Sequence, residues 1–206
     1  MKETLIIIGA GGHGKVVADI AEKTQQWEKI YFLDDNPSIQ SVGKYRVVGV
    51  AADIKKYEKN AQFFVAIGNN IIRQEVQSKL ENQGFTAATL IHPNSIIASD
   101  VEIGSGSAIM AGAIINSSAR IGKGCIINTA SSVDHDCVIE DYVHISPGAH
   151  LAGNVHVGTR SWLGLGSLII NNLCICSDCT VGAGAVIIQN IDEPGTYVGV
   201  PARKVK

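Results

Sequence analysis

Residues 95–190 read SIIASD, VEIGSG, SAIMAG, AIINSS, ARIGKG, CIINTA, SSVDHD, CVIEDY, VHISPG, AHLAGN, VHVGTR, SWLGLG, SLIINN, LCICSD, CTVGAG and AVIIQN when they are written in blocks of six. The third residue of every block, from Ile97 to Ile187, is Ile, Leu or Val, and no insertion breaks the period. The first residue is Ser, Ala or Cys in twelve of the sixteen blocks. Because side chains alternate along a strand, each block predicts a short strand and a turn whose first and third side chains point inward. A helix cannot keep a period of six, so the repeat predicts a parallel β-helix.

Glycine directly follows the aliphatic residue in five of these blocks. We expect the chain to change direction sharply at these positions, where the absence of a Cβ helps. The five residues are Gly104, Gly122, Gly158, Gly164 and Gly182.

Residues 1–90 show a different pattern, in which strands alternate with helices. The expected elements are a strand at 5–8, the loop GAGGHG at 9–14 with a helix after it, strands at 30–33 and 63–67, and a helix at 71–82. Such alternation predicts a small parallel sheet with its loops at the carboxyl edge. The expected fold is therefore an α/β, half-Rossmann-like domain at 1–90, followed by an all-β parallel β-helix domain at 91–206.

The loop at 9–14 matches the spacing GxGxxG, and Asp34 and Asp35 follow about 20 residues later, as in a dinucleotide-binding fingerprint. A complete dinucleotide fold has two halves, however, and this segment has room for one. A nucleotide sugar fits that space better than NAD. Amides at the start of the helix can face a phosphate, and the acidic pair can accept hydrogen bonds from hydroxyls. The alternative is that the glycines only make a tight turn.

Composition narrows the class of protein. The 206 residues are 46% hydrophobic and 17% charged, which is typical of a globular chain, and a net charge of -2 makes nucleic acid an unexpected partner. The apolar run at 5–8 is too short to span a bilayer and lacks a signal-peptide pattern, so a cytoplasmic location is expected.

The five cysteines are an odd number in a chain without an export signal, which favours reduced thiols. The spacing Cys174-x-Cys176-x-x-Cys179 suggests a zinc site. It lacks the second ligand pair that such a site needs, however, so no metal is expected.

Several motifs together resemble one family. They are GAGGHG at 9–14, FLDD at 32–35, AIGNN at 66–70, DHDC at 134–137 and GVPA at 199–202. With the six-residue repeat, they resemble the two-domain hexapeptide-repeat sugar acetyltransferases of bacterial glycan synthesis, including the bacillosamine-pathway and perosamine N-acetyltransferases and sialic acid O-acetyltransferase-like proteins. The resemblance implies a left-handed triangular helix with three blocks per coil. It also implies a homotrimer that binds acetyl-CoA between subunits, with a UDP-linked amino sugar as the other substrate.

Acetyl transfer from a thioester needs a base and donors for the developing oxyanion. His135 lies between two acids, and an imidazole is a suitable base near neutral pH. The resemblance makes His135 the catalytic base and Asp136 its orienting acid. It places His144 and Gly153 at acetyl-CoA, with the Gly153 amide as oxyanion donor. His144, His150 and His156 are expected on three successive outward faces, so they cannot form one cluster in one chain.

The remaining site residues are expected to bind the nucleotide sugar. Asn128 is a candidate contact for the sugar, although a structural turn role explains it equally well. The expected substrate-binding residues are Gly11, Gly12, His13, Gly14, Asp34, Asp35, Ile67, Gly68 and Asn128.

The predicted function is acetyl-CoA-dependent N-acetylation of the amine of a UDP-4-amino-4,6-dideoxy-GlcNAc-type sugar, by direct transfer with a histidine base. O-acetylation of sialic acid or another glycan sugar is the alternative. Two other classes remain open: a nucleotide-sugar-binding protein without activity, because repeat helices also persist as scaffolds, and an NAD-dependent enzyme. The intact Asp134-His135-Asp136 motif argues against an inactive binding protein. The absence of the second half of a dinucleotide fold argues against an NAD-dependent enzyme.

Overall fold

The computed structural model describes residues 2–57 and 61–205, and the chain divides into two compact units, Met1–Pro93 and Asn94–Lys206. The first unit is α/β. Its elements in chain order are β1 Lys2–Ile8, α1 Gly12–Thr24, β2 Trp27–Leu33, β3 Ser41–Val42, β4 Tyr45–Arg46, the 3-10 helix η1 Ala51–Lys56, β5 Gln62–Val65, α2 Asn70–Asn82, β6 Thr86–Ala87 and β7 Leu90–Ile91. The predicted strands and helices are present, each within a few residues of its expected bounds.

The four main strands of this unit form a parallel sheet in the order β2-β1-β5-β6. β1 and β5 are central strands, which explains the unbroken apolar runs at 5–8 and 63–65. Ile6 and Ile8 pack in one cluster with Ile54 of η1 and Leu80 of α2. Because the strands are parallel, the loops after β1, β2 and β5 all leave from the same edge of the sheet. The sequence analysis missed the β3–β4 hairpin and η1, since their apolar positions are too few to show a period.

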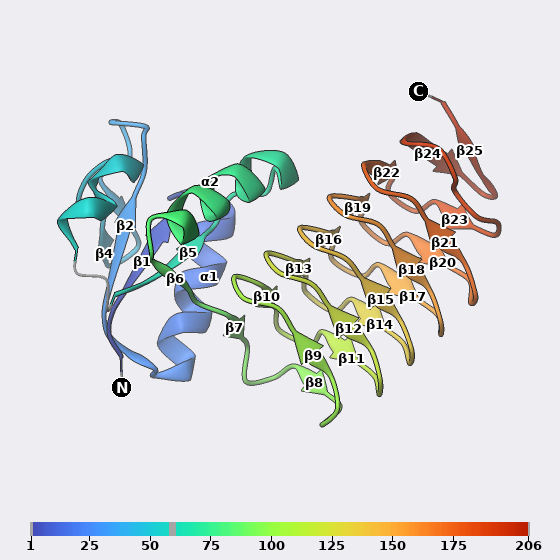
Figure 1. Ribbon diagram of the computed structural model, residues 1–206, viewed down its shortest axis with the longest axis horizontal. Coiled ribbons are helices and arrows are strands. Elements are labelled where there is room, and N and C mark those ends of the chain that lie inside the picture. Colours follow the sequence, from blue (N-terminus) through green and yellow to red (C-terminus); the bar gives the residue numbers. More distant parts are fainter. Residues whose placement is uncertain (1, 58–60, 206) are drawn as a thin grey trace. The chain divides into compact units, whose positions relative to one another are not determined.

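The second unit is a parallel β-helix, as the repeat predicted, and it is left-handed, as the resemblance implied (Figure 1). Its strands are β8 Ile96–Ile97, β9 Glu102–Ile103, β10 Ala108–Ile109, β11 Ile114–Ile115, β12 Arg120–Ile121, β13 Ile126–Ile127, β14 Ser132–Val133, β15 Val138–Ile139, β16 His144–Ile145, β17 His150–Leu151, β18 His156–Val157, β19 Trp162–Leu163, β20 Leu168–Ile169, β21 Cys174–Ile175, β22 Cys179–Val181, β23 Val186–Ile187, β24 Gly195–Gly199 and β25 Ala202–Lys204.

Successive strands enter three sheets in turn, so every third strand stacks on the one before it. One sheet runs β8-β11-β14-β17-β20-β23, a second runs β9-β12-β15-β18-β21, and the third contains β10-β13-β16-β19-β22 followed by the antiparallel hairpin β24–β25. A residue therefore pairs with the residue 18 positions later, as Ile115 does with Val133 and Val133 with Leu151.

The interior of the β-helix consists of the predicted first and third positions. The third-position side chains from Ile109 to Ile187 are all at most 3% exposed, and those of Ile97 and Ile103 are partly buried against the same cluster. Burying one such side chain contributes about 1.5–3 kcal/mol relative to leaving it in water. At the first position, Ser161 also links coils: its Oγ donates to the Cys176 carbonyl at 2.9 Å and accepts from the Cys179 amide at 3.1 Å.

The turns differ from the expectation in one respect. The left-handed backbone conformation lies at the sixth position of each block from Gly106 to Gly184, including non-glycine residues such as Asp136. The glycines that follow the aliphatic residue are needed for a different reason. A Cβ on Gly158 would lie 2.4 Å from the Ser177 amide nitrogen in the next coil. These glycines permit close stacking of the coils, and the sixth residue makes the turn.

Candidate active site

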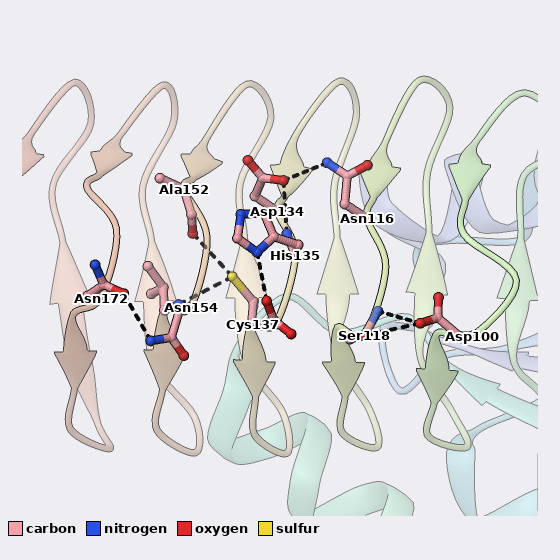
Figure 2. A network of polar contacts seen from close by, with 11 residues as sticks. Asp100, Asn116, Ser118, Asp134, His135, Cys137, Ala152, Asn154 and Asn172 are labelled. Carbon is pink, nitrogen blue, oxygen red and sulfur yellow. Dashed lines mark hydrogen bonds and ion pairs between the residues drawn. The ribbon is translucent and has the colours of Figure 1, made fainter.

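Residues 134–136 form the corner that follows β14, where Asp134 is hydrogen-bonded to the preceding coil through Asn116 (Figure 2). The Asp134 carboxylate accepts hydrogen bonds from the Asn116 side chain at 2.8 Å and from the His135 amide at 2.9 Å. These two hydrogen bonds lower the pKa of Asp134, the amide of His135 first. Asp134 is therefore a fixed negative charge that anchors the backbone directly before His135.

The His135 imidazole is oriented by the next residue. Its Nδ1 lies 2.7 Å from the Asp136 carboxylate, and both side chains are 61% exposed. With Nδ1 donating to this carboxylate, Nε2 carries the lone pair. The hydrogen bond that the imidazole donates to Asp136, followed by the charges of Asp134 and Asp136, raises the pKa of His135. This is the arrangement of an oriented general base on an exposed side chain.

Gly153, which lies 18 residues after His135 and thus one coil later, forms a surface for the imidazole. A Cβ on Gly153 would lie 2.5 Å from both Cε1 and Nε2 of His135. Only a residue without a side chain leaves this ring in place. The structure thus brings His135, Asp136 and Gly153 together, as the sequence analysis expected for a reaction centre.

His144 and Asn128 meet elsewhere in the β-helix. The Asn128 side-chain nitrogen lies 3.1 Å from Nε2 of His144, and His144 stacks on Trp162 with ring centroids 6.0 Å apart. His144 belongs to β16 and Asn128 directly follows β13 of the same sheet, whereas His135 lies at the corner between the other two sheets. Within one chain they therefore do not join His135. His144, His150 and His156 do lie on three different sheets, as expected.

The glycine-rich loop of the first unit lies at the carboxyl edge of its sheet. Gly11 is the N-cap of α1 and Gly12 begins the helix, and the space around both is open enough for a Cβ. Gly14 is required for packing, since its Cβ would lie 2.2 Å from the Gly9 carbonyl oxygen. The loop therefore leaves the amides at the start of α1 accessible to an anion, as helix N-termini often do.

The two aspartates after β2 have separate roles. Asp34 accepts the Ala10 amide at 2.6 Å and so fixes the glycine-rich loop, whereas Asp35 accepts the Ala51 amide at 2.9 Å. Asp34 also lines an open cavity of about 580 Å³ with Arg46, and Asp35 lines another of about 270 Å³ with Lys55. Both carboxylates thus lie at cavities on the edge where the sequence analysis expected a nucleotide sugar.

His13 and Arg73 form the buried part of this edge. His13 Nε2 is inaccessible and has no hydrogen-bond partner among the described residues. Burial, and then the charge of Arg73, lower the pKa of His13 to about 4, so the imidazole is neutral. Arg73 is fully buried and donates to the carbonyls of Ile67 and Gly68 at 3.0 and 3.2 Å. It therefore shapes the loop that carries those two expected substrate residues.

Sequence analysis did not identify Arg73, Asn116 or Trp162. Arg73 had a detectable signal, because a cation in the first turn of a helix opposes the helix dipole and needs local partners. Trp162 occupies an outward second position and is 47% exposed, which is unusual for tryptophan. Asn116 had no detectable signal in the sequence, since its partner Asp134 is 18 residues away. In the described ranges, no three His, Cys, Asp or Glu side chains are close enough to hold a metal ion, and no helix is long and apolar enough to cross a membrane.

Comparisons with known proteins agree on one family. A family profile, the PglD N-terminal domain, matches residues 4–80. UDP-N-acetylbacillosamine N-acetyltransferase of Bacillus subtilis (strain 168) is 37% identical over 53% of this chain and 52% of that protein, so the match spans about half the length of this relative. GDP-perosamine N-acetyltransferase of Escherichia coli O157:H7 is 31% identical over 79% of this chain and 76% of that protein.

A solved structure matches the whole chain. The acetyltransferase domain of PglB from Neisseria gonorrhoeae FA1090, in complex with acetyl coenzyme A, is 39% identical and covers 100% of both chains with a TM-score of 0.97. Fold and sequence are therefore shared over both units.

Proposed function

Because the chain belongs to the two-domain hexapeptide-repeat sugar acetyltransferases, we propose that it transfers the acetyl group of acetyl-CoA to the amine of a nucleotide-linked amino sugar. The preferred acceptor is a UDP-4-amino-4,6-dideoxy-GlcNAc-type sugar, the kind of acceptor given in the name of the B. subtilis relative, UDP-N-acetylbacillosamine N-acetyltransferase. The proposed reaction uses no metal ion. The first unit binds the nucleotide sugar, the second carries out the transfer, and a cytoplasmic location stays a prediction.

The observation that carries this proposal is the corner at His135. Nδ1 of the imidazole faces Asp136 at 2.7 Å, so Nε2 is available to accept the proton of the attacking amine. The amine attacks the thioester carbonyl directly as Nε2 takes this proton. The imidazolium then returns the proton to the departing CoA sulfur, which leaves as the thiol without an acyl-enzyme intermediate. Asp134 and Asp136 stabilise the imidazolium that forms. Gly153 lies so close to this ring that it has no room for a Cβ, and its backbone amide is the proposed donor to the developing oxyanion.

The edge of the first unit supports an anionic acceptor. Open amides begin α1, and the buried Nε2 of His13 lacks a partner among the described residues. A nucleoside diphosphate offers oxygen atoms to the amides that begin α1, next to His13, and its ribose and sugar hydroxyls are hydrogen-bond donors for the carboxylates of Asp34 and Asp35. The other members of the proposed set are Gly11, Gly12, Gly14, Ile67 and Gly68.

The separation of His144 from His135 supports a site completed by a second copy. Asn128 holds His144 in the sheet opposite the corner of His135, so one chain presents the two halves on different sides. In a homotrimer, His144 of one subunit is available to the His135 corner of its neighbour, with acetyl-CoA between them. A stable monomer by sedimentation velocity would remove this part of the proposal.

The test is release of CoA thiol from acetyl-CoA by the purified protein. We expect turnover with the UDP-linked 4-amino sugar and its loss in His135→Ala, with the product shown by mass spectrometry to be acetylated on nitrogen. Turnover only with GDP-perosamine would replace the proposed nucleotide and leave the proposed reaction, N-acetylation, unchanged. Turnover only with sialic acid or its CMP form would replace N-acetylation with O-acetylation.

A further inference from the structure

The three cysteines near the end of the β-helix separate into one isolated thiol and one pair. Cys174 lies on the outward side of β21 and is exposed, whereas Cys179 begins β22 and is 1% exposed. Cys176 lies between them and is half-buried, with its Sγ 3.3 Å from the Sγ of Cys179. Within residues 2–57 and 61–205 no third ligand completes a metal site, so the pair needs another explanation.

The backbone on both sides of this pair is already held. Cys176 donates its amide to the Ile191 carbonyl at 2.8 Å, and Cys179 donates its amide to Ser161 Oγ at 3.1 Å. Between the two cysteines, Asp178 is held by the guanidinium of Arg160 with its Oδ1 2.7 Å from Nε. A disulfide has a sulfur–sulfur distance of about 2.05 Å, so the sulfurs must approach by roughly 1.3 Å. Side-chain rotation can supply this movement while the corner keeps its hydrogen bonds.

We propose that Cys176 and Cys179 are a thiol–disulfide pair, an oxidation site that takes a small hydroperoxide as its oxidant. Hydrogen peroxide oxidises Cys176 to a sulfenic acid and is reduced to water. The sulfur of Cys179 then attacks that sulfur, its proton joins the departing hydroxide, and a second water leaves. Two thiols and one hydrogen peroxide thus give one disulfide and two waters.

Exposure sets the order of the two steps. Cys176 is reachable from solvent, and Cys179 is not. Burial, and next the hydrogen bond with Cys176, raise the pKa of the Cys179 thiol to about 12, so it stays protonated until its partner has been oxidised. This chemistry is independent of the proposed acetyl transfer and uses none of its residues.

The experiment is peptide mapping of the full-length protein after treatment with hydrogen peroxide and alkylation of the remaining thiols. Trypsin releases residues 161–203 as one peptide, which contains all three cysteines. We expect this peptide to lose two hydrogen atoms and to carry one alkyl group instead of three. Reduction with dithiothreitol before alkylation should restore all three alkyl groups. Cys174→Ser should still lose the two hydrogens, whereas Cys176→Ser and Cys179→Ser should not.

Serine at position 179 should preserve the fold, because Ser107, Ser161 and Ser167 fill the same inward position in other coils. Should it fail to fold, Cys179→Ala replaces it, with Ala149 as the precedent. The proposal is overturned if the loss of hydrogen persists without either member of the pair or needs Cys174. It is also overturned if Cys176 ends as a sulfinic acid while Cys179 remains alkylatable.

Discussion

The contact between Gly153 and His135 predicts that one methyl group at position 153 will reduce turnover without unfolding the protein. In Gly153→Ala the new Cβ would lie 2.5 Å from Cε1 and Nε2 of His135, whereas ordinary contacts begin at 3.4 Å. The ring must therefore move by about 0.9 Å. A displacement near 1 Å from the reactive geometry costs about 10²-fold in rate, or roughly 2.7 kcal/mol of transition-state stabilisation.

The protein should remain folded because the His135 side chain is 61% exposed and can turn toward water. We expect the free energy of unfolding to change by less than about 1 kcal/mol. The substitution keeps the backbone amide, so it tests the positioning of the imidazole separately from donation to an oxyanion.

The assay is kcat/KM from CoA thiol release, with melting temperature measured in parallel. His135→Ala and the double variant His135→Ala/Gly153→Ala are the matched controls. If Gly153 acts through the imidazole, the second substitution should cost little once the ring is gone. Activity of Gly153→Ala within threefold of wild type would refute the reasoning, and so would a double variant far less active than His135→Ala.

Three further predictions concern the base, the stacking of coils and the core. In Asp136→Asn, loss of the carboxylate that raises the pKa of His135 should shift the low-pH limb of kcat/KM to lower pH and reduce its maximum; an unchanged limb would contradict the orienting role. Gly158→Ala should lower the melting temperature because its Cβ meets backbone, whereas Gly148→Asn should be tolerated at a position where other coils place Asn. Ile145→Ala should reduce the free energy of unfolding by about 2–5 kcal/mol in denaturant titrations.

The candidate site was only partly predictable from the sequence. His135 was identifiable because acids flank it in the chain, and its partner Asp136 is its direct neighbour. Asp34 was expected to contact a hydroxyl, yet its carboxylate also fixes the glycine-rich loop through the Ala10 amide. Arg73 was missed because its role depends on carbonyl groups of the loop before α2, and a residue type does not reveal which carbonyls it will contact.

The sequence by itself determined the β-helix, because the signal is local and repeated: the aliphatic and small residues of each block select its inward side regardless of the rest of the chain. Tertiary structure alone decided which side chains meet across coils. Gly153 lies beneath His135 and Asn116 reaches Asp134 because stacking sets residues 18 positions apart side by side. Such contacts depend on the register and on side-chain rotation at each corner, and neither is visible in a pattern that repeats every six residues.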